Sequence, residues 1–115
     1  MTVNNIEKPV SPKKFADCIR EEFSKYNIQV QDVLLFGSRA TKNFRPDSDW
    51  DFLIITQKSV ERTLKRKILS QIRRRLIFEY DIDSDLLVLP KDDISSATKD
   101  VGRVSYYAMR DGIPV

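Results

Sequence analysis

The chain of 115 residues contains no histidine and a single cysteine, Cys18. Zinc sites are built chiefly from cysteine and histidine ligands, so the sequence effectively excludes zinc chemistry. One cysteine cannot form an internal disulfide, which fits a reducing cytoplasm as the expected location. Cys18 lies on the apolar side of an expected helix, and we therefore assign it to the core.

Long apolar runs are also missing. No stretch approaches the roughly 20 apolar residues that cross a bilayer, and residues 1–10 are polar rather than typical of a signal peptide, so we expect no contact with a membrane. The length is that of one domain. We expect a flexible tail over residues 1–10 and a single domain over residues 11–115, with no internal repeat.

The net charge is only +3, but the cations are unevenly distributed. One segment has Glu61 as its only nearby acid, and it contains Lys58, Arg62, Lys65, Arg66, Lys67, Arg73, Arg74 and Arg75. Such a surface favours an acidic partner, a nucleic acid or the phosphates of a nucleotide. The alternative is a solvated helix face without a partner.

The spacing of apolar residues predicts helices and strands in alternation. A serine followed by proline, at Ser11 and Pro12, is typical of a helix start. The expected elements are a helix from there to about Asn27, strands over 33–36 and 50–56, a long helix over 60–77, a strand over 83–89, helical pieces between 94 and 109, and an edge strand over 113–115. This alternation predicts an α/β fold in which helices pack on a small sheet.

The first expected strand runs directly into Gly37 and Ser38. A sharp turn from strand to helix needs the conformational freedom of glycine, and the N–H groups after such a turn form a nest that attracts anions. Ser38 adds a hydroxyl donor, and Arg39 and Lys42 add positive charge. The pattern predicts a phosphate-binding corner. The alternative is an ordinary turn, because many turns contain the same Gly-Ser pair.

Two carboxylates precede the second strand, at Asp49 and Asp51. Alternation along a strand puts both on one side and Trp50 on the other, where it is expected to pack. Like charges held so close repel unless a cation lies between them. Ligands that are all oxygen suit Mg²⁺ or Mn²⁺. The alternative is a polar turn followed by an exposed strand residue.

A third carboxylate is expected where the last long strand begins. We choose Asp85, because it leads directly into the apolar run and lies on the same face as Leu87. Asp83 and Asp81 remain alternatives, as does a solvated start to the strand.

Together, Gly37-Ser38, the Asp49-Trp50-Asp51 motif ten residues later and Asp85 resemble the minimal nucleotidyltransferases of the DNA polymerase β superfamily. The amino-acid sequence of the loop between the two motifs is also similar to that of the family. The resemblance extends from about Phe15 to Gly112. It implies a polymerase-β-like fold with a small mixed sheet and flanking helices.

The resemblance also implies an activity. Asp49, Asp51 and Asp85 would hold the metal, and Asp85 could also activate an attacking hydroxyl. The nucleotide would bind at Gly37, Ser38, Arg39 and Lys42. Single-domain members resemble antitoxins that act beside a helical HEPN-type toxin, and the implied reaction transfers AMP from ATP, with Mg²⁺, to a tyrosine of that toxin.

Two further hypotheses for the function stay open. The chain could be a binding module that has lost transfer, in which case the basic helix would dock an acidic surface. It could also be a catalytic subunit that acts on a small molecule or RNA with a separate substrate-binding chain. Nucleic acid is a possible but not a favoured partner. The chain is not itself a HEPN ribonuclease, because that site needs a histidine.

Overall fold

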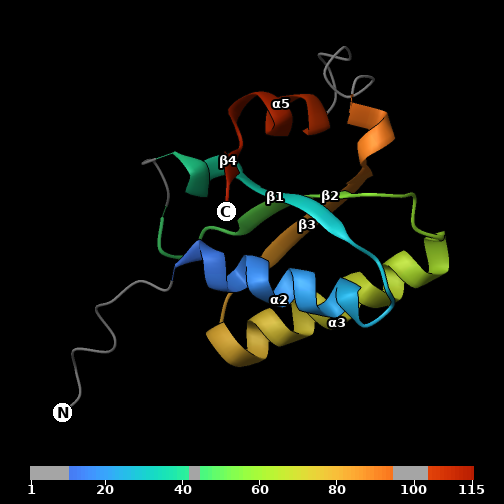
Figure 1. Cartoon of the computed structure of the whole chain (residues 1–115). Helices are drawn as coiled ribbons and strands as arrows, with labels where there is room; N and C mark the ends of the chain where they lie inside the picture. The colour runs from blue at the N-terminus through green and yellow to red at the C-terminus, as the bar shows by residue number, and fades with distance from the viewer. Residues whose placement is uncertain (1–10, 42–44, 95–103) are drawn as a thin grey trace.

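Four strands form one mixed sheet in the order β3-β2-β1-β4 (Figure 1). The computed structural model describes residues 11–41, 45–94 and 104–115, with no side-chain positions for residues 104–107. The strands are β1 (Val30–Phe36), β2 (Trp50–Thr56), β3 (Ser84–Pro90) and β4 (Ile113–Pro114). β1 is antiparallel to β2 and β4, whereas β2 and β3 are parallel. The mixed sheet implied by the resemblance is confirmed.

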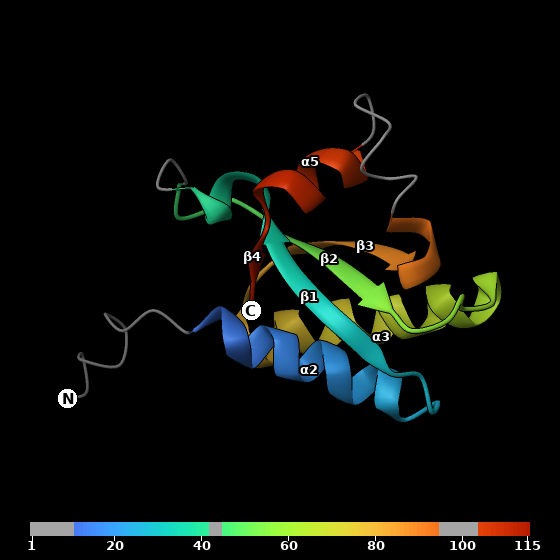
Figure 2. The same ribbon diagram turned by 45° about the horizontal axis from the view of Figure 1, so that its top comes forward.

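Helices cover both faces of this sheet. Two of them, α2 (Pro12–Ser24) and α3 (Arg62–Tyr80), lie side by side on one face, and α5 (Val104–Asp111) lies on the other (Figures 1 and 2). α3 is the crossover that two parallel neighbouring strands require. Two short 3₁₀ turns, η1 (Gly37–Ala40) and η2 (Lys91–Asp93), follow β1 and β3.

Local signals explain where the first helix begins and ends. The Ser11 side chain accepts a hydrogen bond from the Lys13 N–H and so caps α2, and Pro12 occupies its first turn. The helix ends at Ser24, three residues before the expected Asn27. Asn27 has a φ of 59°, a left-handed conformation that asparagine tolerates better than most residues.

The long helix α3 is capped at both ends. The Glu61 carboxylate accepts hydrogen bonds from the N–H groups of Thr63 and Leu64, at 3.0 and 2.9 Å. Asp81, with a φ of 54°, ends the helix in a left-handed cap. Within the described ranges, no helix is both long and apolar enough to cross a membrane.

The core has two parts, one on each face of the sheet. Alternation along β2 sends Phe52 and Ile54 toward α2 and α3, and Leu53 and Ile55 toward α5. All four are at most 2% exposed, because both faces are covered, which explains why β2 is apolar without interruption. Cys18 is buried in the first part as expected, and burial raises the pKa of its thiol.

Prolines lie in both outer strands of the sheet. Pro90 ends β3, and Pro114 lies in β4, opposite Leu34 of β1. The C-terminal residue continues this contact, because the Val115 N–H donates to the Val33 carbonyl at 2.9 Å. The edge strand expected over 113–115 is confirmed.

Candidate active site

The predicted carboxylates Asp51 and Asp85 are brought side by side. They are register partners on the parallel strands β2 and β3, and neighbouring strands lie about 4.8 Å apart. By alternation, both side chains lie on the face of the sheet that carries Leu53 and Leu87, the face covered by α5 (Figure 2). The register therefore makes these two acids neighbours on one face of the sheet.

Gly37 lies directly against the Asp51 carboxylate. Its φ of +73° is one that side chains rarely adopt, and an added Cβ would overlap Asp51 Oδ2 and lie 3.0 Å from its Cγ. The closeness follows from the register, because Phe36, the residue before Gly37, is paired with Asp51 across β1 and β2. The glycine is therefore needed both for the turn and for the space that the carboxylate fills.

The electrostatics of the site tie three acids together. Burial raises the pKa of the Asp51 carboxyl, and the negative charges of Asp85 and Asp49 raise it further. Asp49 lies one residue before β2 and is exposed. In the described part of the chain, no three acidic, cysteine or histidine side chains are placed so that they could hold one ion together as they stand.

Arg39 braces the loop that carries Asp49. Its Nε and Nη2 atoms donate to the Ser48 carbonyl at 3.2 and 3.0 Å, and Nη2 also donates to the Pro46 carbonyl at 3.0 Å. The guanidinium lies over the Trp50 ring, 4.5 Å from its centroid. The sequence suggested Arg39 as a nucleotide ligand and did not predict that it braces the loop. The available signal was an arginine close to the only tryptophan in the sequence.

Trp50 packs away from the carboxylates, as expected. Its ring meets Phe15 of α2 edge-to-face, with the ring centroids 4.9 Å apart. Trp50 therefore anchors the start of β2 to the helical layer, while Arg39, over the same ring, holds the preceding loop. These contacts limit the positions that Asp49 can take.

The other predicted site residues differ in their placement. Ser38 is exposed, and its carbonyl accepts hydrogen bonds from the Thr41 N–H and hydroxyl, at 3.2 and 2.9 Å, which closes η1. Lys42 lies outside the described residues. Of the alternative third acids, Asp81 caps α3, and Asp83 precedes β3 and accepts a hydrogen bond from the Trp50 N–H at its carbonyl. Neither has the register position of Asp85.

Two hollows in the described part of the surface are not lined by Asp51 or Asp85. One of about 130 Å³ borders the braced loop and is lined in part by Arg39, Ser48 and Asp83. A larger one, of about 470 Å³, is lined by residues of α2 and α3, on the other face of the sheet.

The donor set fits a hard divalent cation. Asp49, Asp51 and Asp85 offer oxygen atoms only, and their mutual repulsion is the kind that a bound cation relieves. The two opposed acids supply a partial site, and Asp49 lies near enough for its charge to act on Asp51. Mg²⁺ keeps several waters and commonly uses one or two carboxylates, so a partial set suits it.

A family model described as polymerase beta, nucleotidyltransferase matches residues 18–104. Among solved structures, the MntA–HpeT toxin–antitoxin with two Asp-to-Glu substitutions matches with a TM-score of 0.60 and 16% identity, over 91% of this chain and 71% of that chain. A toxin–antitoxin with AMP-PNP matches with a TM-score of 0.57 and 16% identity, over 85% and 69% of the two chains.

A third structure contains a tri-AMPylated Shewanella oneidensis HEPN toxin in complex with an MNT antitoxin. It matches with a TM-score of 0.53 and 17% identity, over 89% of this chain and 66% of that one. No curated protein sequence matches significantly. At these identities the structural likenesses establish the fold.

Proposed function

Because the chain belongs to the polymerase β nucleotidyltransferase family, we propose that it transfers AMP from ATP to a hydroxyl group of a partner protein. The proposed acceptor is a tyrosine of a HEPN-type toxin, and the proposed role is that of an antitoxin. One observation carries the proposal: Asp51 and Asp85 are register partners, with Gly37 packed against the first. A complex of an MNT antitoxin with an AMPylated HEPN toxin, in a relative of the same fold, supports the choice of acceptor.

In this mechanism Asp49, Asp51 and Asp85 would hold Mg²⁺. When bound, the metal would neutralise the triphosphate and stabilise charge on the attacking and leaving oxygens. Gly37 leaves room for the Asp51 carboxylate beside the turn, and the backbone N–H groups near Ser38 would receive phosphate oxygens.

Asp85 is the proposed acceptor of the proton from the attacking hydroxyl, because it is the more exposed of the two opposed acids. A phosphorus–oxygen bond would form to the acceptor as the bond to pyrophosphate breaks. Arg39 would contribute by keeping Asp49 within reach.

The test is transfer of label. The purified chain is incubated with α-labelled ATP, Mg²⁺ and the product of the adjacent reading frame, and the label on each protein is counted. We expect label on the partner, loss of at least about 100-fold in Asp51→Asn, and near-normal transfer in the matched control Asp83→Asn. Equal transfer by Asp51→Asn and the unaltered chain would refute the role of that carboxylate.

A second candidate is a binding antitoxin that no longer transfers. It is favoured by the exposed position of Asp49 and by the lack, among the described side chains, of three acids ready to share an ion. In the same experiment it predicts a stable complex without label, unchanged in Asp51→Asn. Label on RNA or on a small molecule would instead support a catalytic subunit with another acceptor.

A further inference from the structure

A basic groove lies along the first half of α3, away from the carboxylates. It has a volume of about 440 Å³ and is lined by Val60, Arg62, Lys65, Arg66, Leu69 and Arg73. The two apolar residues form its floor, because both also pack against the core beneath α3. The four cations surround that floor. A groove of this kind combines an apolar contact with a rim of one charge.

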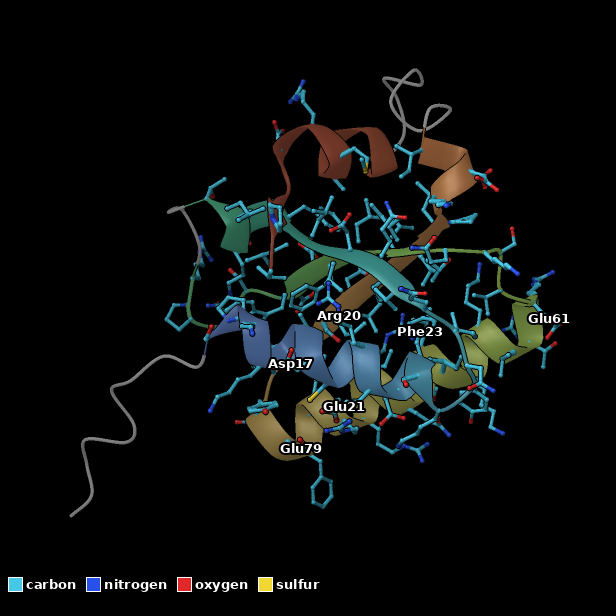
Figure 3. All side chains as sticks on the ribbon, viewed as in Figure 1. Asp17, Arg20, Glu21, Phe23, Glu61 and Glu79 are labelled. Atoms are coloured by element: carbon cyan, nitrogen blue, oxygen red, sulfur yellow. The ribbon has the colours of Figure 1, made fainter. Side chains whose placement is uncertain are left out.

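The cations of the basic groove have no acidic partner among the described residues. Arg75 of the same helix shows the contrast, because it pairs with Glu21, Glu22 and Glu79 at 2.8 to 3.1 Å. Figure 3 shows Glu61, which precedes α3, and Glu79, in its last turn, at opposite ends of the helix. Glu61 is already used as the cap. The positive charge of Arg75 is therefore neutralised by acids of α2 and α3. The positive charges of the basic groove are not neutralised by any described acid.

The position of these charges opposes the local stability of the helix. The first turn of α3 contains no acid, and it begins with Arg62. Cations near a helix N-terminus face the positive end of the macrodipole, which is unfavourable. Lys65 and Arg66, in the next turn, repel Arg62 at helical spacing. Folding alone does not account for this choice of residues, so the groove is better explained by a bound counter-charge.

The lining indicates the chemistry of that counter-charge. Arg62, Arg66 and Arg73 span about 16 Å along the helix axis, which is the length of three helical turns. The lining contains no aromatic residue, whereas single-stranded nucleic acid binds chiefly by stacking on aromatic rings. Arginine pairs well with carboxylates, and the apolar floor would receive an aliphatic side chain. These features favour a protein segment over a nucleic acid.

We propose that the basic groove docks an acidic amphipathic helix of a partner protein. Its apolar face would rest on Val60 and Leu69, and its carboxylates would meet the arginine rim. The groove lies on α3, which covers one face of the sheet, whereas Asp51 and Asp85 lie on the face covered by α5. A docked helix would therefore leave the carboxylates open, and its binding does not depend on the proposed transfer.

The test uses a fluorescein-labelled 18-residue helical peptide of Glu, Leu and Ala, with the leucines on one face. Anisotropy titrations compare the unaltered chain with the double variant Arg66→Glu/Arg73→Glu. We expect about tenfold or greater loss of affinity in this variant. The matched control Lys67→Glu/Arg74→Glu changes the same charge on the same helix outside the groove, and we expect it to stay within about threefold. Asp51→Asn should bind normally.

A scrambled peptide of the same composition separates docking from general charge attraction. It should bind about tenfold more weakly, because its leucines no longer share a face. Equal affinity for both peptides, or an equal loss in both double variants, would overturn the proposal. Tighter binding of a 12-nucleotide oligouridylate, abolished by Arg66→Glu/Arg73→Glu, would overturn it in favour of a nucleic acid. The milder Arg66→Gln/Arg73→Gln replaces the reversal if the latter fails to fold.

Discussion

Asp51 and Asp85 occupy the same level of two parallel strands, so each carboxylate has the other as its neighbour across the sheet. Two unit charges about 5 Å apart repel by about 1 to 3 kcal/mol, depending on how well solvent screens them. Gly37 limits escape on one side, because Asp51 is packed against it. The pair is a source of instability that a divalent cation would remove.

We predict that Asp51→Asn stabilises the protein when metal is absent. The pKa of Asp51 is raised in the folded state, so its contribution to stability is present at low pH and is lost as the pH rises through that pKa. Calorimetry in EDTA should show a melting temperature a few degrees higher at pH 8 and little change at pH 3. With Mg²⁺ the unaltered chain should gain stability and the variant should gain less. Asp83→Asn is the control, and a lower melting temperature for Asp51→Asn at pH 8 would contradict the prediction.

Gly37→Ala should be destabilising and should also disturb the site. The positive φ and the overlap with Asp51 together should cost about 1 to 3 kcal/mol of unfolding free energy, measured by urea denaturation. Gly112→Ala is a useful comparison, because a Cβ there would also be crowded, by the Ala108 carbonyl rather than by the Asp51 carboxylate. Both variants should lose stability. Among the molecules that remain folded, only those of Gly37→Ala should bind Mg²⁺ more weakly than the unaltered chain. Equal Mg²⁺ binding would show that the glycine serves only the turn.

Arg39 is predicted to be a positioning residue. Arg39→Ala should release the 45–48 loop, so the Mg²⁺ concentration for half-maximal transfer should rise about tenfold or more, while the KM for ATP changes less. Arg39→Lys should recover only part of the loss, because lysine lacks the planar fork. Trp50, the only tryptophan, reports the change directly by its fluorescence. An equal rise in the KM for ATP would instead assign Arg39 to the nucleotide.

The ion pairs between α2 and α3 should make the protein sensitive to acid. Glu22 is only 2% exposed. Burial raises the pKa of its carboxyl, but hydrogen bonds from Lys25 and Arg75 more than offset this, so the pKa lies below its ordinary value. The stabilisation is therefore present above the unfolded pKa of about 4.5 and lost as the pH falls through the folded value.

Arg75→Met tests this cluster. It should lower the free energy of unfolding by about 2 to 3 kcal/mol at pH 7, because the buried Glu22 loses Arg75 as a partner. Lys25 remains beside Glu22 and limits the loss. Chemical denaturation at pH 7 and pH 3 provides the measurement, with the neighbouring Arg74→Met as control. The difference between Arg75→Met and the unaltered chain should shrink at pH 3. A difference that is the same at both values would show that Arg75 acts by packing alone.

Much of the fold was predictable because its signals are local. The apolar runs located β2 and β3 to within a residue, and Ser11 and Pro12 marked the start of α2. β1 begins at Val30, three residues earlier than expected. Its first residues mix polar and apolar side chains, so the sequence there has no clear strand pattern. The sheet order and the parallel pairing of β2 with β3 depend on tertiary packing and were not predicted; the resemblance to a family supplied only the mixed character of the sheet.

The candidate site was predictable in part for the same reason. Alternation related Asp51 to Asp49 on one strand and Asp85 to Leu87 on another, but the common face and the register depend on the pairing of two strands about thirty residues apart in sequence. The bracing by Arg39 likewise depends on how the loop folds back over Trp50. Composition revealed the excess of cations, but not that Arg75 is neutralised by acids of another helix while the basic groove is not.

The two prolines in the outer strands bear on how copies of this protein can associate. A strand edge recruits further strands through its free N–H groups, and proline has none to offer. With Pro90 at one border and Pro114 at the other, the sheet is poorly suited to growing from molecule to molecule. Concentrated solutions should therefore resist fibril formation, and any lasting assembly should be built through helices.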